Sequence, residues 1–432
     1  MTAAARARRA VYDRTLDGDQ IFGRRWRSPI RGPWLTSVFA SMLLVGLPVV
    51  AITGLLSFIA YGPQFTGNAH PAHVGWLHLP YFDWPTRPSW LYRFTQGLHV
   101  TLGLALIPLV FAKLWSVMPR LFALPPVRSV ASALERLSLF LLVGSVLFEI
   151  VTGVMNVQYD YSFGFDFYAA HYYGAWVFSA AFVTHVALKL PAMIAALRSR
   201  RFRNEFRTSR AQTRPETGSS DLIAKNPAAP TISRRGAIGF AAGAGLTVAA
   251  FSVGQTAGDV FRPTALLAPR GRTASSGPTG FPVNRTARTA RITEEMTGDG
   301  WRLSLIGASN QQLSRNELLA MDLRAAHLPI ACVEGWSTTQ TWTGVRLADL
   351  AALVDARDDV HSAHVRSLEP HGAFNSATLT RGQILNEDSL LALRVNGVDL
   401  SSDHGYPARI IVPALPGVHN TKWVRSIEFR LT

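Results

Sequence analysis

The sequence contains one cysteine, Cys332, in 432 residues. A disulfide within the chain is therefore impossible, and a structural zinc site built on several thiolates is excluded. Acidic residues are also scarce, since 28 Asp and Glu stand against 43 Lys and Arg and the net charge is +15. The arginines lie in short segments beside apolar spans, which is the pattern of membrane topology and not of a nucleic-acid-binding face. We therefore expect no nucleic-acid partner.

Long apolar runs are absent after about residue 255. Before that point, five stretches are long enough to cross a hydrocarbon core, which requires about 20 apolar residues. They cover residues 34–61, 91–118, 130–156, 169–197 and 236–254. The sequence therefore predicts an all-α transmembrane four-helix bundle and one anchor helix, with membrane lipid as a partner.

Six domains or segments are expected from these runs and from composition. Their boundaries are 1–32 for a cytoplasmic arginine-rich arm, 33–198 for the four-helix domain, 199–232 for a cytoplasmic linker, 233–255 for the anchor helix, 256–290 for a linker and extended arm, and 291–432 for a globular domain.

Basic residues predict the orientation of the spans. The N-terminal arm and the segment 198–235 are rich in arginine, whereas the connection 61–90 contains only Arg87. By the positive-inside rule the N-terminus is cytoplasmic, and five spans put everything after residue 254 outside. We therefore expect a multi-pass protein of the inner or plasma membrane with an extracytoplasmic C-terminal domain.

The fifth span differs in character from the other four. Ser233-Arg234-Arg235-Gly236 precedes a Gly- and Ala-rich run, which resembles a twin-arginine export signal embedded in the chain. The alternative is a stop-transfer helix with two positive flanking residues. No Ala-x-Ala cleavage site follows, so we expect the helix to remain as an anchor.

Three histidines, His99, His171 and His185, lie inside apolar spans, where a polar side chain normally faces the bundle interior. His171 and His185 are 14 residues apart, which is about 21 Å of helical rise, and they point to the same face. His99 and His171 share a depth on the outer side, so they are expected to ligate one haem iron from two helices.

A second haem on the inner side has weaker support. Lys113 is the geometric counterpart of His185, but lysine is an uncommon haem ligand. The alternative is that Lys113 snorkels to the interface and His185 is a hydrogen-bonded interior residue. Arg93 is a candidate partner for a haem propionate. Glu149, inside the third span, is a candidate for proton transfer or quinone contact, or for a hydrogen bond to a neighbouring helix.

The four spans, with a histidine on the second and a spaced histidine pair on the fourth, resemble the b-type cytochrome subunits of bacterial formate dehydrogenases and nickel hydrogenases. The resemblance covers the four-helix domain and implies haem b and a quinone or quinol partner. The first helix lacks the histidine of that family, which leaves the choice between one and two haems open. Among the outer-loop residues, His70, His73 and His78 are interpreted as loop surface.

The globular domain is predicted to be mixed α+β and mainly β. Short, turn-bounded runs that are β-branched or alternating indicate strands, and two stretches indicate helices. The strands are expected at 301–306, 364–368, 391–395, 409–412 and 423–431, and the helices at 316–321 and 347–354.

Three motifs in this domain resemble the sulfite oxidase fold of molybdopterin oxidoreductases, and in particular the branch that contains the periplasmic methionine sulfoxide reductase catalytic subunit. They are Cys332-Val333-Glu334-Gly335-Trp336, Asp403-His404-Gly405-Tyr406-Pro407-Ala408-Arg409 and Asn420-Thr421-Lys422-Trp423-Val424. From its chemistry alone, a lone cysteine is more often a small buried hydrophobic residue. The resemblance instead implies that Cys332 binds molybdenum.

The resemblance also implies which residues hold the pterin and its phosphate. They are His404, Arg409, Asn420, Thr421, Lys422 and Trp423, with Asn284 and Arg285 on an extended arm over the active site. Arg409 and Lys422 are the cations that a phosphate requires.

One local charge bears on the reaction. Sulfite oxidases surround a dianionic substrate with arginines, including a run shortly after the metal-binding cysteine, whereas Glu334 stands there in this chain. A carboxylate disfavours an anion and can supply a proton. Phe374 stands where a tyrosine of sulfite oxidases is expected, a second departure from that family. We therefore expect quinol-driven removal of oxygen from a small or protein-borne S-oxide or N-oxide, with Cys332, Glu334 and Arg285 as catalytic candidates.

Other functions remain open from the sequence. The same parts operating in reverse would oxidise sulfite or a similar substrate and reduce quinone, and Arg285 and Arg346 would then be candidates for binding an anion. A haem electron-transfer protein with a non-catalytic outer domain, or a membrane receptor or assembly factor without a cofactor, are the further alternatives.

Overall fold

The computed structural model describes residues 26–65, 67–68, 81–122, 130–157, 163–218, 220–224, 226–272, 276–372 and 374–432. The three outer-loop histidines at positions 70, 73 and 78 and most of the N-terminal arm lie outside these ranges. The chain divides into two compact units, each made of three segments. The first unit is Met1–Pro48, Gly103–Val151 and Gly174–Val248; the second is Val49–Leu102, Thr152–Tyr173 and Ala249–Thr432.

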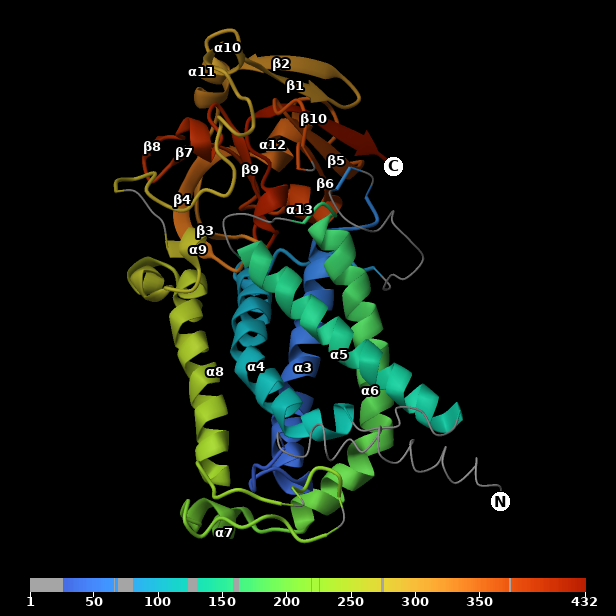
Figure 1. The fold of residues 1–432 in the computed structure, drawn as a ribbon. Coiled ribbons are helices and arrows are strands. Elements are labelled where there is room, and N and C mark those ends of the chain that lie inside the picture. The colour runs from blue at the N-terminus through green and yellow to red at the C-terminus, as the bar shows by residue number, and fades with distance from the viewer. Residues whose placement is uncertain are drawn as a thin grey trace. The chain divides into compact units, whose positions relative to one another are not determined.

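Five long helices account for the apolar part of the chain (Figure 1). They are α3 (Pro33–Ala60), α4 (Leu91–Leu121), α5 (Val130–Val157), α6 (Phe167–Arg198) and α8 (Arg234–Ala257). Each coincides with one expected span, and each has the length and composition to cross a membrane.

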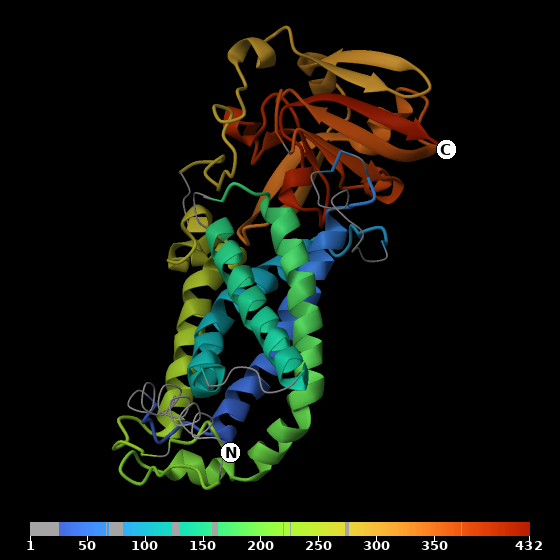
Figure 2. The same cartoon turned by 45° about the vertical axis from the view of Figure 1, so that its right-hand side comes forward.

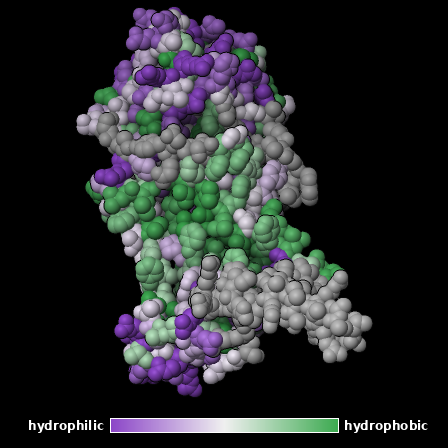
Figure 3. Space-filling view, in the orientation of Figure 1, coloured by the Kyte–Doolittle hydropathy of each residue, from purple (hydrophilic) through white to green (hydrophobic). Residues whose placement is uncertain are grey.

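The surfaces of these helices are hydrophobic. Phe140 of α5 and Phe240 of α8 are 74% and 76% exposed, and Figure 3 shows hydrophobic side chains gathered over the helices. Burying so much apolar surface in lipid stabilises a membrane protein, whereas leaving it in water is unfavourable. The helices are therefore compatible with spanning a membrane.

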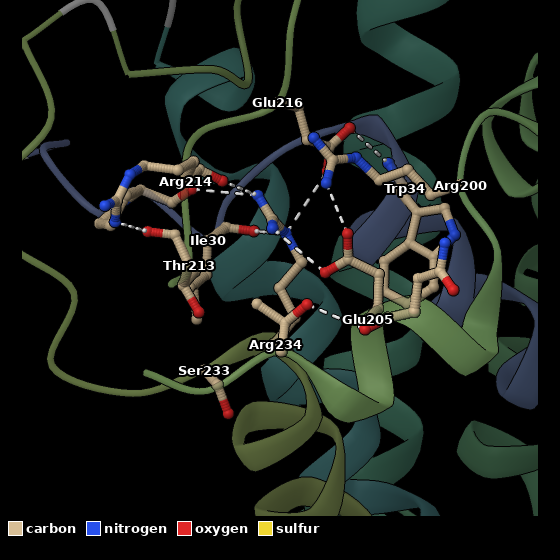
Figure 4. A network of polar contacts seen from close by, with 12 residues as sticks. Ile30, Trp34, Arg200, Glu205, Thr213, Arg214, Glu216, Ser233 and Arg234 are labelled. Carbon is tan, nitrogen blue, oxygen red and sulfur yellow. Dashed lines mark hydrogen bonds and ion pairs between the residues drawn. The ribbon is translucent and has the colours of Figure 1, made fainter. Parts of the chain in front are cut away.

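In the first unit, the segment around the start of α8 is built on the buried guanidinium of Arg234. The short helix α7 (Phe202–Arg207) supplies Glu205, whose carboxylate lies 3.3 Å from Arg234, and Glu216 lies 3.9 Å from it. The side chain of Arg234 is 1% exposed and also donates to the carbonyls of Pro29, Ile30 and Arg214 (Figure 4). One member of the twin-arginine pair is therefore a buried structural residue.

In the second unit, ten strands form two sheets, coloured orange to red in Figures 1 and 2. The first sheet has the order β2-β1-β10-β5-β6, in which β1 and β10 are parallel and the other pairs are antiparallel. Its strands are β1 (Arg302–Ile306), β2 (Asn310–Ser314), β5 (Val360–Ser367), β6 (Ser376–Thr380) and β10 (Val424–Leu431).

The second sheet has the order β3-β4-β7-β8, with β9 also paired to β7. Its strands are β3 (Arg324–Ala331), β4 (Ser337–Arg346), β7 (Leu390–Val395), β8 (Val398–Asp399) and β9 (Arg409–Ile411). Alternate side chains of these strands form a core around Trp342, which is fully buried, together with Leu328, Ile330 and Leu390. Cys332 directly follows the last residue of β3.

Short helices complete the second unit. They are η2 (Asp259–Thr264), α9 (Pro269–Arg272), α10 (Glu294–Thr297), α11 (Arg315–Leu319), α12 (Leu347–Ala352), α13 (Arg381–Leu385), η3 (Ser402–His404) and η4 (Gly417–His419). The segment 256–290 is therefore not simply a linker and an extended arm, because η2 and α9 fold within it. Arg262 anchors this part by donating to the carbonyls of Gly271 and Ser337.

The mixed, β-rich character expected for the C-terminal region is confirmed. The expected strands correspond to β1, β5, β7, β9 and β10, and the expected helices to α11 and α12. No strand was named from the sequence at β2, β3, β4, β6 or β8, and no helix at α13. For β4 the reason is its Ser- and Thr-rich sequence, in which only some apolar positions alternate.

Candidate functional site

Cys332 begins a tight connection, residues 332–336, between β3 and β4 (the Cys332 loop). Its backbone N–H donates to the Trp336 carbonyl at 2.9 Å, and its carbonyl accepts from the N–H of Gly335 at 3.0 Å. Gly335 has φ +95°, which glycine adopts without the cost that a side chain would bring. The loop therefore holds the sulfur at a fixed point at the end of a paired strand.

The Cys332 thiol is 2% exposed. Burial, followed by repulsion from the Glu334 carboxylate, raises the pKa of the Cys332 thiol well above its usual range. The side-chain amide of Asn284 donates toward the sulfur at 3.8 Å. Because a bound cation favours the deprotonated ligand, a metal at this position would convert the thiol to a thiolate.

A pocket opens at the sulfur. It is lined by residues from all three sequence motifs and from the segment before them: Pro282, Val283, Asn284, Ile330, Cys332, Trp336, Asp403, His404, Arg409, Gly417 and Lys422. Gly417 is required here, because an added Cβ would lie 3.0 Å from the carbonyl oxygen of Ala331. The structure therefore brings Cys332, Asn284, His404, Arg409 and Lys422 to one cavity.

Two cations, Arg409 and Lys422, face this pocket, and Asp403 and Glu369 attract the charge of Lys422. Arg409 donates to the carbonyls of His404 and Asn420 at 3.0 and 3.2 Å, and Lys422 donates to the carbonyls of Arg285 and Asp403. Neither has an ion pair with a carboxylate within the described parts of the chain. Burial lowers the pKa of Arg409 to about 9, and burial followed by repulsion from Arg409 lowers the pKa of Lys422 to about 7. The charged forms are therefore poorly solvated, and a bound anion such as a phosphate would stabilise both.

His404 is held neutral beside these cations. Burial, followed by repulsion from Arg409 and Lys422, lowers its pKa to about 3. Its Nδ1 lies 2.8 Å from the Ser401 hydroxyl and its Nε2 lies 3.3 Å from the Phe281 carbonyl. Since a carbonyl can only accept, the Nε2–H tautomer is the one that satisfies both contacts.

Three of the expected cofactor-binding residues do not line the pocket. Asn420 uses its side-chain oxygen to accept from the Val412 N–H at 2.8 Å, and Trp423 donates its indole N–H to the Ser402 carbonyl at 2.7 Å. The buried Thr421 hydroxyl has no hydrogen-bond partner within the described residues. Asn420 and Trp423 therefore support the walls of the site from behind.

The two other catalytic candidates, Glu334 and Arg285, are held by ion pairs, and the Glu334 side chain also hydrogen-bonds Cys332. The Glu334 carboxylate lies 2.5 Å from Arg270 and accepts from the Trp336 indole at 2.9 Å, and Arg285 forms an ion pair with Glu369. Burial raises the pKa of Glu334, and Arg270 opposes that rise. The sequence could not reveal the Arg270 partner, since it lies in α9, far away along the chain. Arg346 pairs with Asp349, and Phe374 packs edge-on against Tyr168.

His99 and His171, the predicted haem-binding pair, are adjacent in the second unit. The ring centroids of His99 and His171 are 6.3 Å apart, with the ring planes at 84°. His99 Nδ1 lies 2.9 Å from the Val50 carbonyl of α3, and His171 Nδ1 lies 2.9 Å from the Thr152 hydroxyl of α5. The structure therefore brings this predicted pair together, with a hydrogen-bond partner for each ring from a neighbouring helix.

The inner residues have different surroundings. The ammonium of Lys113 donates to the Thr36 carbonyl at 3.0 Å, which commits it to α3. His185 is partly buried in the same unit. Arg93 does not extend toward the histidines, because it donates to the Thr256 carbonyl and the Thr339 hydroxyl at 3.0 and 3.1 Å.

Comparisons with known proteins agree with a molybdenum-cofactor site at Cys332. Residues 290–432 match the family described as the oxidoreductase molybdopterin binding domain. The uncharacterized oxidoreductase YuiH of Bacillus subtilis is 31% identical over 154 residues, which cover 35% of this chain and 74% of that protein. The sulfite oxidase of Arabidopsis thaliana is 34% identical over 111 residues, covering 22% of this chain and 28% of that protein.

Among solved structures, the sulfane dehydrogenase SoxCD of Paracoccus pantotrophus matches with 21% identity and a TM-score of 0.28, over 30% of this chain and 38% of that one. The chain spans less than a third of the length of the Arabidopsis sulfite oxidase.

The site and these matches define an oxidoreductase that uses a molybdenum cofactor. The chain belongs to the family of sulfite oxidase-type molybdopterin oxidoreductases. The residues fit the cofactor, because a buried sulfur ends the pocket and two buried cations have no ion pair within the described residues.

Proposed function

We propose that this protein is a membrane-bound molybdenum oxidoreductase that uses electrons from a quinol, through one haem b, to remove oxygen from a neutral S-oxide or N-oxide. In this proposal α3 to α6 form a four-helix haem domain, and the C-terminal domain lies on the extracytoplasmic side. For an S-oxide the balanced reaction converts one sulfoxide and one quinol into one sulfide, one quinone and one water. The molybdenum cofactor, when bound, supplies the two-electron exchange of oxygen with the substrate.

The observation that carries the choice of substrate is the composition of the pocket. Its only guanidinium or ammonium groups among the described residues are Arg409 and Lys422, and both suit the pterin phosphate. The rest of the lining includes the apolar or uncharged residues Ile330, Trp336 and Asn284, together with Asp403, whose carboxylate accepts from the Ala287 N–H. Arg285 is held by Glu369, and Glu334 is neutralised by Arg270. A neutral oxide therefore fits better than a sulfite dianion, which would need an unpaired cation near the metal.

The chain's own residues have defined tasks in this account. Asn284 donates toward the sulfur and helps to hold a thiolate, and Arg409 and Lys422 bind the phosphate of the cofactor. The Glu334 carboxylate ties Trp336 to Arg270, which fixes the Cys332 loop instead of delivering a proton. Glu334 is therefore proposed as a positioning residue, in place of the catalytic role expected from the sequence.

The proximity of His99 and His171, whose ring centroids are 6.3 Å apart, supports one haem. His99 and His171 would hold the haem iron through their imidazoles, and the haem would supply one-electron transfer. The resemblance to b-type cytochrome subunits implies that the haem would be of the b type, and a single cysteine does not allow the usual two-cysteine attachment of a c-type haem. The Lys113 ammonium already has a backbone partner, so we do not propose a second haem.

Spectroscopy on detergent-purified protein tests the proposed direction. The haem is reduced with a quinol under anaerobic conditions, and methionine sulfoxide, trimethylamine N-oxide or sulfite is then added. We expect either oxide to reoxidise the reduced haem. In a separate sample with the haem oxidised, we expect sulfite to leave the spectrum unchanged. If sulfite instead reduces the oxidised haem and both oxides have no effect, the reaction is the reverse one. That second candidate is favoured by the similarity to sulfite oxidases.

A further inference from the structure

We infer that Gln96 is a positioning residue that couples the Cys332 loop to the haem-ligating helix α4 for electron transfer. The inference rests on the proposed function, in which Cys332 holds molybdenum and His99 and His171 hold the haem. Every residue in the argument belongs to the second unit.

The central observation is one hydrogen bond. The side-chain amide of Gln96 donates to the carbonyl of Val333 at 2.5 Å, although the two residues are 237 positions apart. Gln96 is 4% exposed, so water does not compete for this bond. Val333 is bonded to Cys332, and Gln96 precedes His99 by three residues on the same helix. One hydrogen bond therefore connects the loop that carries the sulfur to the helix that carries a proposed haem ligand.

The same face of α4 makes further contacts with the loop and its strand. Arg93, Gln96, Gly97 and Val100 follow the i, i+3, i+4, i+7 spacing of one helical face. Arg93 donates to the Thr339 hydroxyl of β4, and an added Cβ on Gly335 would lie 2.9 Å from Cβ of Val100. The Cys332 loop therefore lies directly against this face.

The end of α8 holds the other side of the loop. The Thr256 hydroxyl donates to the Gly335 carbonyl at 2.6 Å, and the Ser337 hydroxyl donates to the Thr256 carbonyl at 2.6 Å. Gly97 allows this approach, since an added Cβ there would lie 2.1 Å from Cγ2 of Thr256. These contacts fix Gly335 and Ser337, whereas the Gln96 bond fixes the residue next to the sulfur.

The electron balance is that of the proposed reaction. A quinol loses two electrons and two protons, and the electrons reach the outer site one at a time. Reduction of one oxide consumes two electrons and two protons and releases water. Gln96 takes no part in bond making. It fixes the distance between the haem, which is the electron donor, and the molybdenum site, which is the electron acceptor. It also supplies a hydrogen-bonded connection between them.

The test compares Gln96→Leu with the matched variant Thr95→Val. Thr95 is buried on the same turn, but its hydroxyl donates only to carbonyls of its own helix. The haem is prereduced, one equivalent of methionine sulfoxide is added, and the haem reoxidation rate is followed by absorbance. We expect Gln96→Leu to slow this step about tenfold, because a geometry-dependent step loses up to roughly 10²-fold for a displacement of about 1 Å. Thr95→Val is expected to leave the rate unchanged.

Molybdenum content, the haem spectrum and the haem midpoint potential are measured in every variant and are expected to equal those of wild type. If Gln96→Leu loses either cofactor, Gln96→Met replaces it, since its side chain is of similar length and has no hydrogen-bond donor. An unchanged reoxidation rate in a variant that retains both cofactors would overturn the role of Gln96 alone. Wild-type protein without haem would contradict the proposed function itself, so the two failures are distinguishable.

Discussion

Two buried arginines, Arg234 at the start of α8 and Arg409 at the start of β9, have opposite electrostatic surroundings. Arg234 has two carboxylates, Glu205 and Glu216, and three backbone carbonyls (Figure 4). Arg409 has two backbone carbonyls and the face of Trp342, and its Nε has no hydrogen-bond partner among the described residues.

This difference distinguishes an arginine that stabilises the fold from an arginine that binds a ligand. Burying a charge costs several kcal/mol unless a partner compensates it. Around Arg234 the chain itself supplies the partners, so no ligand is needed. Around Arg409 and Lys422 the described residues supply no ion pair, although Asp403 and Glu369 attract the charge of Lys422. The net positive charge beside the pocket is the expected environment for a phosphate. This net charge therefore points to the cofactor as clearly as the presence of Cys332 does.

Removing Arg234 should have the largest effect on stability. Arg234→Met leaves the buried Glu216 without an ion pair among the described residues and leaves Glu205 with Arg200 alone. Breaking a buried ion pair costs about 3–5 kcal/mol. We expect a lower unfolding temperature and faster trypsin cleavage near the start of α8, measured on detergent-purified protein.

Arg235→Met is the matched control for that change. It removes the other twin arginine, which is exposed and donates only to the Phe206 carbonyl, so its stability should stay close to wild type. If both arginines serve in export, both variants will reduce the amount of protein delivered to the membrane. Equal stability of the two variants would contradict the structural role of Arg234.

Removing Arg409 should act on the cofactor and much less on the fold. Arg409→Met deletes a charge-assisted contact, typically about 1.5–3 kcal/mol, so cofactor retention should fall by roughly 10- to 100-fold. Molybdenum per chain after extensive dialysis is the measurement. A variant that unfolds while the cofactor-free wild type stays folded would show that Arg409 is structural like Arg234, and the comparison would fail.

The pH dependence of the unfolding stability tests the same comparison at Lys422. Its folded pKa is about 7 without an anion, below its ordinary value of 10.5, so the unfolded chain binds more protons between these two values. The cofactor-free protein should therefore gain stability as pH rises from about 7 toward 10. Thermal unfolding across this range should show the slope in wild type and lose it in Lys422→Met. With the cofactor bound, the phosphate raises the pKa of Lys422 and the slope should also disappear. A flat profile in cofactor-free wild type would contradict a poorly solvated charge at Lys422.

The smallest effect is expected for substitutions beside His99 and His171, whose hydrogen-bond partners come from neighbouring helices. An added Cβ at Gly54 would lie 2.9 Å from Cε1 of His99, whereas at Gly153 it would lie 3.6 Å from Cε1 of His171. Gly54→Ala should therefore shift His99 and lower haem occupancy at a cost of about 1–3 kcal/mol. Gly153→Ala, in ordinary van der Waals contact, should retain haem. Haem per chain by absorbance distinguishes the two, and equal retention would contradict a tightly held His99.

Much of this arrangement could be predicted from the sequence. Hydropathy located the five long helices to within a few residues, because each span is bounded by polar or turn-forming segments. The motif residues Cys332, Arg409 and Lys422 were expected at one site, and they do line one pocket.

The rest depends on contacts between distant parts of the chain. The sequence predicted a free carboxylate at Glu334, because its partner Arg270 is 64 positions away. The hydrogen bond from Gln96 to Val333 had no sequence signal either. The strand β3 was missed because His327 and Pro329 interrupt its apolar pattern, although pairing with β4 along its whole length defines it. Local patterns predict elements, whereas the electrostatic state of a side chain depends on neighbours that only the fold supplies.

Elemental analysis of detergent-purified protein, with Cys332→Ala and His171→Ala as variants, tests the central claim most directly. The account predicts about one molybdenum and one iron per wild-type chain, since one thiolate and one histidine pair form the two sites. Molybdenum should be lost in Cys332→Ala with iron retained, and iron should be lost in His171→Ala with molybdenum retained. Wild-type protein with iron but no molybdenum, from cells that make the cofactor, would contradict the proposed catalytic function.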